Sequence, residues 1–297
     1  MTYAYTAYGL RLASAFPLPE LLPSTPGIAD ITIRYADVPE SLPDTSSHGI
    51  AWQCAPGRLL LSVVHVARYL IVGDREIHIC PLPDSHESDV RLFLLGSVLG
   101  ALLHSRRMLV LHASVIETEQ GAVLFAGKSG AGKSTLLAAF LQRGYRMLAD
   151  DKAAIALNGD EVPLAMPGYP LMRLTRSAAD ALCYPVQASQ LRKSLDKYVL
   201  PIDAFCATPL PVHAMYSLRA HNRSDIQVER LLAVDTFDVL NGATYRRGFL
   251  HEAAQRRAHF QILGAVASRS RVVRIARPAH TWNVDALREH IEEDLRR

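Results

Sequence analysis

The feature that most constrains this chain is an eight-residue motif, Gly-x-x-x-x-Gly-Lys-Ser, set between an apolar segment and a helix-forming segment. The preceding residues 122–126 are continuously apolar and predict a buried strand, and the residues from Thr135 onward predict a helix. A glycine-rich turn from a strand into a helix is typical of a phosphate-binding loop, or P-loop. The motif consists of Gly127, Lys128, Ser129, Gly130, Ala131, Gly132, Lys133 and Ser134. We therefore expect an α/β fold built around this loop.

The residue types of the motif suit a nucleotide triphosphate bound with Mg²⁺. Glycines let successive backbone N–H groups converge on phosphate oxygens, and the helix N-terminus adds partial positive charge. Lys133 is expected to reach the β- and γ-phosphates, and Ser134 is expected to bind the metal. The segment expected to bind ATP runs from Gly127 through Thr135. The alternative is a glycine turn followed by a surface lysine.

Two adjacent carboxylates, Asp150 and Asp151, follow the next apolar strand. Ligands bind to α/β sheets at the carboxyl ends of the strands, so this position suits a second part of the site. The pair suggests that Asp151 holds Mg²⁺ while Asp150 accepts a proton from an attacking hydroxyl. Alternatively, one carboxylate binds the metal and the other caps a turn or faces solvent.

A histidine, His112, ends the preceding apolar run. Beside a phosphate loop, an imidazole can orient an aspartate or stabilise charge, but the position of His112 alone does not establish such a role. The alternative is a structural histidine whose hydrogen bonds are satisfied at a strand end.

The pattern of the sequence changes near residue 85. Before it, short β-branched and aromatic runs alternate with turns, which predicts a β-rich N-terminal subdomain over residues 1–85. Residues 86–297 are expected to form the P-loop catalytic domain. Helices are predicted over residues 89–106, 133–143, 175–183 and 245–268, and at the C-terminus. Ser85 or Ser88 is expected to cap the first helix, and Asn283 or Asp285 the last.

Charge and cysteine content narrow the class of partner. The 297 residues carry 32 Lys and Arg against 29 Asp and Glu, a net charge of +3, which argues against a nucleic-acid or polybasic membrane partner. The longest apolar stretch, residues 92–103, is shorter than the ~20 residues that span a bilayer. Four cysteines without a Cys-x-x-Cys pair argue against a zinc site or a disulfide framework. With no secretory signal at its start, the chain is expected to be cytoplasmic.

The motifs together resemble the catalytic domain of the HPr kinase/phosphorylase family. The resemblance covers roughly residues 105–160 and rests on the run His-Ala-Ser-Val at residues 112–115, the P-loop and Leu-Ala-Asp-Asp at 148–151. It implies an HPr-kinase-like fold and an ATP- and Mg²⁺-dependent serine kinase. The resemblance also implies that Asp150 is the general base, that Lys133 binds phosphate, and that Ser134 and Asp151 bind the metal. It adds His112, as the residue that assists Asp150, to the expected catalytic residues Asp150 and Lys133.

The chain lacks the long glycine-rich signature and the N-terminal domain of that family, so the resemblance implies an acceptor other than HPr. Residues 8–21, 167–174 and 195–198 resemble HPr-kinase-like proteins found with lasso-peptide biosynthesis machinery. Members of that group phosphorylate the C-terminal serine of a precursor peptide. The expected partner is therefore a precursor peptide or a small protein.

Cationic residues gather after the acidic pair, where a kinase needs positive charge for the transferring phosphate and for a substrate carboxylate. Arg173 and Lys197 are the first choices, and Lys193 is a further candidate. A solvated charged face is the alternative explanation. The full set is Arg173, Arg176, Arg192, Lys193 and Lys197.

Other functions remain open on the same scaffold. A small-molecule kinase, an HPr-like protein kinase and a regulatory ATP-binding module would each use a P-loop and an acidic pair. A GTPase is expected to carry an Asn-Lys-x-Asp element, and the sequence has none.

Overall fold

The computed structural model describes residues 2–187, 191–192, 196–279 and 283–296. The chain forms two compact units, each assembled from segments distant in sequence. The first comprises Met1–Val110 and Tyr245–Ile262, and the second comprises Leu111–Thr244 and Leu263–Arg297. This division differs from the boundary expected at residue 85, because the helical segment after that residue belongs with the strands before it.

The first unit is β-rich, as the alternating runs predict. Its sheet has the strand order β3-β1-β2-β4-β9-β8-β7-β6-β5. Neighbouring strands are antiparallel except for the β2–β4 and β4–β9 pairs, which are parallel. The strands are β1 (Tyr3–Ala7), β2 (Leu10–Ser14), β3 (Leu22–Pro23), β4 (Ile31–Tyr35), β5 (Ser47–Gly49), β6 (Trp52–Ala55), β7 (Arg58–Val63), β8 (Ala67–Val72) and β9 (Glu76–Pro81).

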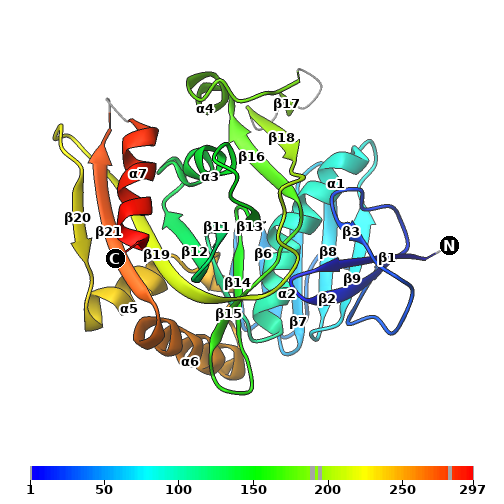
Figure 1. Ribbon diagram of the computed structural model, residues 1–297. Coiled ribbons are helices and arrows are strands. Elements are labelled where there is room, and N and C mark those ends of the chain that lie inside the picture. The colour runs from blue at the N-terminus through cyan, green and yellow to red at the C-terminus, as the bar shows by residue number, and fades with distance from the viewer. Residues whose placement is uncertain (1, 188–190, 193–195, 280–282, 297) are drawn as a thin grey trace. The chain divides into compact units, whose positions relative to one another are not determined.

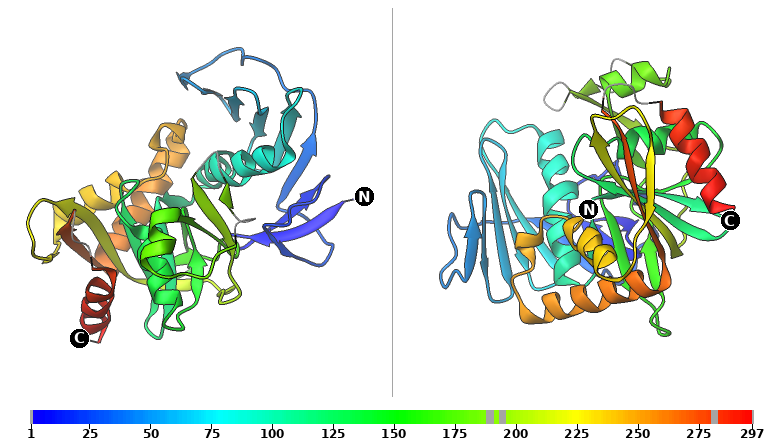
Figure 2. Two further views of the ribbon diagram at one scale, coloured as in Figure 1. Left: turned by 90° about the horizontal axis from the view of Figure 1, so that it is seen from above. Right: turned by 90° about the vertical axis from the view of Figure 1, so that its left-hand side faces the viewer.

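A continuous helical segment lies against this sheet, and Figure 2 shows it in cyan beside the strands. It consists of α1 (Glu87–Phe93), a π-helical turn η1 (Leu94–Val98) and α2 (Leu99–Ser105), which confirms the helix predicted over 89–106. The Tyr69 hydroxyl donates to the Val90 carbonyl at 2.9 Å and fixes the helix on β8. The capping prediction was wrong, because His86 occupies the N-cap position and makes no side-chain hydrogen bond there.

The segment 245–262 completes the first unit. It contains the short helix η3 (Arg247–Phe249) and the beginning of α6 (Ala253–Arg269). Tyr245 is held on both sides, since its N–H donates to the Val110 carbonyl and its own carbonyl lies 2.8 Å from His104 Nε2. The Phe249 ring meets Trp52 edge-on at 5.7 Å. These contacts explain why the single helix expected over 245–268 begins only at Ala253.

The second unit is α/β, which confirms the predicted fold class. Within its main sheet the path β14-β15-β19-β12-β11-β13 is mostly antiparallel, while β12, β19 and β21 run parallel to one another. Its strands are β11 (Ala113–Thr118), β12 (Gly121–Gly127), β13 (Met147–Ala149), β14 (Ala153–Leu157), β15 (Pro163–Met166), β19 (Leu210–His221), β20 (Gln227–Arg230) and β21 (Arg271–Pro278). The boundary between the two units in the sequence falls within β10 (Leu109–Leu111), after Val110.

Helices and a small second sheet complete this unit (Figure 1). The predicted C-terminal helix is confirmed as α7 (Val284–Leu295). Of the two predicted caps, Asn283 is the one observed, since its side chain accepts a hydrogen bond from the Ala286 N–H. The helices are α3 (Lys133–Leu141), α4 (Arg176–Ala181), α5 (Ala233–Gly242) and α7 (Val284–Leu295). The small sheet consists of β16 (Leu171–Thr175), β17 (Leu191–Arg192) and β18 (Lys197–Pro201).

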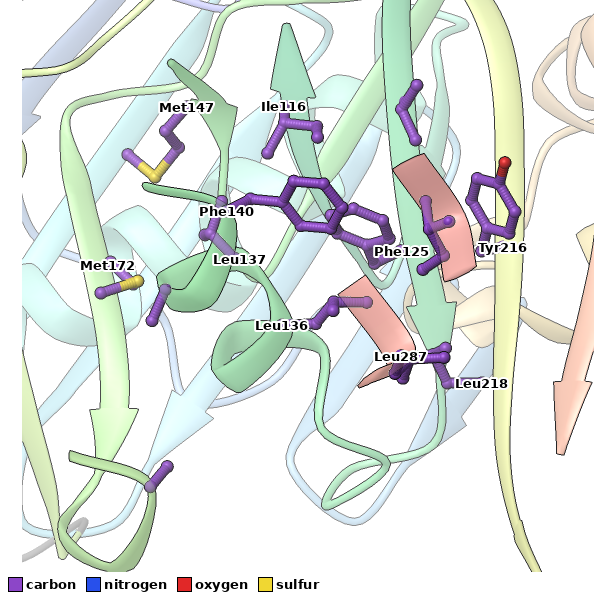
Figure 3. Close-up of a cluster of buried hydrophobic side chains, with 14 of the residues drawn as sticks. Ile116, Phe125, Leu136, Leu137, Phe140, Met147, Met172, Tyr216, Leu218 and Leu287 are labelled. Atoms are coloured by element: carbon purple, nitrogen blue, oxygen red, sulfur yellow. The ribbon is translucent and has the colours of Figure 1, made fainter. Parts of the chain in front are cut away.

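The core of the second unit lies between α3, α7 and the main sheet, and Figure 3 shows part of it. Phe140 of α3 stacks on Phe125 of β12 with ring centroids 5.1 Å apart, and Tyr145 meets Phe140 edge-on at 4.9 Å. Leu136 and Leu287 are fully buried in the same cluster. Each such side chain contributes about 1.5–3 kcal/mol on burial, so the cluster anchors α3 and the loop before it on the sheet.

Among the described residues, no helix combines the length and the apolar character required to cross a membrane.

Candidate nucleotide-binding site

The P-loop joins β12 to α3 (Figure 1), as the motif predicts. Gly127 ends the strand with φ +152°, and a Cβ atom there would lie 2.7 Å from the Leu218 carbonyl oxygen. Gly130 and Gly132 also have positive φ, at 80° and 100°. L-residues with side chains rarely adopt these angles, so the glycines are required by the path of the loop. The Ala131 N–H closes the turn on the Lys128 carbonyl at 3.0 Å.

The Lys133 side chain folds back over the loop and is 6% exposed. Its ammonium group donates to the Gly127 and Lys128 carbonyls at 3.0 and 3.2 Å and to His112 Nε2 at 3.0 Å. Burial lowers the pKa of this lysine, and the carboxylates Asp150 and Asp151 oppose that shift. The amine is therefore held at the mouth of the loop, where the phosphates of a nucleotide would replace its present acceptors.

Asp150 follows β13 and faces the start of α3. Its Oδ1 accepts from the Ser114 hydroxyl at 2.6 Å and from the Ser134 hydroxyl at 3.1 Å, and its Oδ2 accepts from the Arg173 N–H at 3.0 Å. β11 is paired with β13, and that pairing carries Ser114 to the carboxylate. The Ser134 hydroxyl and the Asp150 carboxylate thus provide two adjacent oxygen donors, the ligand type that Mg²⁺ prefers.

Asp151 faces a different set of groups. Lys152 Nζ lies 3.2 Å and Arg173 Nη1 3.4 Å from its Oδ2, and His112 Nδ1 lies 3.5 Å from its Oδ1. Burial alone would raise the pKa of this carboxyl, but the charges of Lys152 and Arg173 outweigh burial and lower it well below its usual range. The residue has φ +68°, a conformation that Asp tolerates better than most residues. Asp151 is therefore an ionised carboxylate in a fixed position.

His112 connects Asp151 to the P-loop lysine. Its Nδ1 lies 2.9 Å from the Asp151 carbonyl oxygen and its Nε2 lies 3.0 Å from Lys133 Nζ. Since the ammonium group can only donate, Nε2 accepts and Nδ1 carries the proton. Burial, and after it the charge of Lys133, lower the pKa of the ring, so the histidine is neutral at pH 7.

These side chains line one pocket of about 460 Å³, which we call the P-loop pocket. Of the expected cations, Arg173 and Lys197 line it. Arg176 does not line it and forms an ion pair with Asp196 at 3.7 Å. Lys193 and the side chain of Arg192 lie outside the described residues. The pocket residues include His112, Ser129, Gly130, Gly132, Lys133, Ser134, Thr135, Asp150, Asp151, Arg173, Lys197 and Arg277.

The chain matches no protein-family model and no curated protein. It is similar to a solved structure, the Hpr(Ser) kinase/phosphatase from Coxiella burnetii. The identity is 14% and the TM-score 0.33, over 63% of this chain and 90% of that chain.

The sequence motifs did not indicate a role in the pocket for Ser114, Lys152 or Arg277. Ser114 lies two positions after His112, so the same strand end was a usable signal for it. Lys152 directly follows the acidic pair and is fully buried, and burial of a lysine is not visible in sequence. Arg277 belongs to no motif and reaches the pocket only because β21 lies parallel to β19.

Proposed function

We propose that this chain is an ATP- and Mg²⁺-dependent kinase that phosphorylates a serine hydroxyl of a peptide. The observation that carries the proposal is the contact of the Ser134 hydroxyl with the Asp150 carboxylate at 3.1 Å, directly after the P-loop. A second carboxylate, Asp151, lines the same pocket. A pair of oxygen donors for the metal, with a second carboxylate nearby to accept the proton of an attacking hydroxyl, suits phosphoryl transfer to a hydroxyl.

The donor set fits Mg²⁺ bound with a nucleotide. Ser134 and Asp150 would hold the metal, and Lys133 with the backbone N–H groups of the loop would hold the phosphates. When bound, the metal neutralises charge on the β- and γ-phosphate oxygens. The rest of the chemistry is positioning by the chain's own groups.

The sequence pattern predicts that Asp151 binds the metal and that Asp150 accepts the proton. The contacts favour the opposite assignment. Ser134 faces Asp150, so Asp150 is the better metal ligand. Asp151 faces His112 and Arg173 on the pocket side and suits the acceptor hydroxyl. A carboxylate with a low pKa can still accept this proton, because the transition state of phosphoryl transfer is loose and the hydroxyl proton leaves late.

In the proposed step, the serine oxygen forms a bond to the γ-phosphorus as the bond from that phosphorus to the β,γ-bridging oxygen of ATP breaks. ADP leaves with the bridging oxygen, and the serine proton passes to the Asp151 carboxylate. The neutral His112 ring and the Arg173 guanidinium hold that carboxylate in place. No other reactant is required.

Lys197 is the better candidate for recognising a peptide carboxylate. Arg173 already contacts Asp151 through its side chain and Asp150 through its backbone N–H. No ion pair ties Lys197 to another described residue, and its side chain lines the P-loop pocket. The resemblance to precursor-peptide kinases makes a peptide with a C-terminal serine the preferred acceptor.

The test uses a synthetic peptide that ends in serine, incubated with the protein, ATP and Mg²⁺ and analysed by mass spectrometry. We expect the mass of one added phosphate, and we expect Lys133→Ala to abolish it. Amidation of the peptide C-terminus should lower kcat/KM by roughly ten- to a hundredfold, the range for a lost charge-assisted contact.

Equal rates on the free acid and the amide would overturn carboxylate recognition. Turnover of a folded HPr-like protein or of a small metabolite alone would replace the peptide as acceptor. ATP binding without transfer to any hydroxyl would favour a regulatory ATP-binding module.

A further inference from the structure

Arg277 is a buried arginine at the edge of the P-loop pocket. It is the penultimate residue of β21, and its register partner on β19 is Ala220. β19 in turn pairs with β12, whose last residue, Gly127, begins the P-loop. Because the three strands are parallel, their carboxyl ends meet at one edge, which brings Arg277 to the loop. The side chain is 5% exposed and lines the pocket.

Two other arginines on the same strand form ion pairs with carboxylates. Arg271 Nη1 lies 3.5 Å from the Asp294 carboxylate, and Arg274 Nη1 lies 2.7 Å from Glu229. Arg277 instead reaches into the loop, where its Nε donates to the Ala131 carbonyl at 3.1 Å. Its Nη1 donates to the Pro278 carbonyl at 2.9 Å.

The contact with Ala131 has a consequence for the neighbouring amide. A peptide group is planar and trans, so its C=O and N–H point in opposite directions. The guanidinium holds the Ala131 carbonyl, and the N–H of the same peptide group belongs to Gly132. The Gly132 N–H is therefore turned away from Arg277. Gly132 is the N-cap residue of α3, at the end of the loop that receives phosphate.

The burial of a guanidinium is costly, and burial lowers the pKa of Arg277. The guanidinium lines the P-loop pocket, and guanidinium groups bind phosphate oxygens through strong charge-assisted hydrogen bonds.

We propose that Arg277 is a positioning residue of the nucleotide site, which orients the Ala131–Gly132 peptide group for phosphate binding and adds positive charge to the pocket. This inference rests on the proposed function, because it requires that the pocket bind a nucleotide. It concerns the binding of the phosphates and makes no use of the identity of the acceptor.

The test measures the dissociation constants of ATP and ADP with Mg²⁺, by displacement of a fluorescent ATP analogue. The proteins are the wild type, Arg277→Gln, Arg277→Lys and the control Arg274→Gln from the same strand. We expect Arg277→Gln to weaken both nucleotides roughly ten- to a hundredfold, the range for a charge-assisted hydrogen bond. Arg277→Lys keeps the charge but not the planar donor group, and it should recover part of the loss. Arg274→Gln should bind as the wild type does.

Melting curves without nucleotide separate this role from a purely structural one. We expect Arg277→Lys to melt close to the wild type yet to bind ATP more weakly. Wild-type affinity in both Arg277 variants would overturn the role of Arg277, and so would an equal loss in Arg274→Gln. If Arg277→Gln does not fold, Arg277→Lys is the test: weaker ATP binding than the wild type supports the role of Arg277, and wild-type affinity overturns it. A wild-type protein that binds neither ATP nor ADP would refute the proposed function itself.

Discussion

Asp150 and Asp151 are adjacent in sequence, yet their carboxylates face different groups. Asp150 contacts two hydroxyls, from Ser114 and Ser134, whereas Asp151 is surrounded by Lys152, Arg173 and His112. The left-handed backbone of Asp151, with φ +68°, accompanies this change of direction. The two carboxylates are thus chemically distinct despite their identical type.

Substitution by Asn should separate the two roles. Asp150→Asn removes the carboxylate that we propose as a metal ligand, so we expect a higher Mg²⁺ concentration for half-maximal activity. Asparagine tolerates positive φ as aspartate does, so Asp151→Asn should keep the backbone geometry and the nucleotide affinity. It removes the carboxylate that we propose as the proton acceptor, so kcat should fall by ~10²–10⁴. A Mg²⁺ titration of both variants checks this. The opposite pattern would restore the roles expected from sequence, with Asp151 on the metal.

His104 of α2 gives the first unit a sensitivity to acid. It is fully buried, and burial lowers the pKa of its ring to about 4 from the usual 6.5. The folded protein therefore keeps this ring neutral while the unfolded chain protonates below pH 6.5. Its contribution to stability is complete above that pH and is lost as the pH falls toward 4.

We accordingly expect the stability gap between the wild type and His104→Gln to depend on pH. The gap should be largest at neutral pH and should shrink by up to about 3 kcal/mol on approaching pH 4. Denaturant melts across this range measure it. His48→Gln, at an exposed position on β5, serves as the control. A gap that stays constant with pH would contradict the prediction.

At the scale of elements, the strand–loop–helix of the P-loop depends on a glycine at its first position. A methyl group on Gly127 would meet the Leu218 carbonyl oxygen at 2.7 Å and Ala131 Cβ at 3.0 Å, at a φ of +152°. Neither neighbour is the end of a flexible side chain. We expect Gly127→Ala to cost about 1–3 kcal/mol of stability and to weaken nucleotide binding.

A helical glycine provides the matched control. Gly264 lies within α6, and a Cβ there would meet nothing within 4 Å. Gly264→Ala should be neutral or stabilising by about 0.5–1 kcal/mol. Thermal melts of the two variants compare the positions directly. If Gly127→Ala is as stable as Gly264→Ala, the close approach at Gly127 is relieved by movement of the loop and the prediction is wrong.

Local sequence patterns predicted β12, the glycine-rich turn after it, α3 and the cap of α7, because each depends on residues within one element or its turn. They did not predict β19, the 12-residue strand beside β12. Nor did they predict α5 or the late start of α6. Arg277 was missed for the same reason, since its place in the pocket depends on a register between distant strands. Pairing of that kind leaves no signal at the residues themselves.

At the scale of the whole molecule, the first unit requires the segment 245–262. Phe249 packs on Trp52, the Tyr245 N–H bonds to Val110, and the Glu252 carboxylate accepts from the Gly57 N–H at 3.0 Å. Residues 1–85 alone also lack the helical segment that covers β8. The strands of residues 1–85 therefore lack two segments that pack against them in the first unit, the helical segment and residues 245–262.

We therefore expect a fragment of residues 1–85 to show no cooperative thermal transition, and a fragment of residues 1–110 to be markedly less stable than the same fragment linked to 245–262. Circular dichroism melts of the three fragments measure this. A cooperative transition in the 1–85 fragment would support a domain boundary at that residue instead.

The discontinuous first unit also bears on how the protein is made. The ribosome synthesises the strands of the N-terminal sheet before the second unit, but residues 245–262 follow only after residues 111–244 of that second unit. Until then the surface around Trp52 that Phe249 covers stays open to other chains. The N-terminal sheet therefore lacks its last segment throughout the synthesis of residues 111–244. Translational pauses and chaperones acting on this stage should affect the yield of native protein more than its stability once complete.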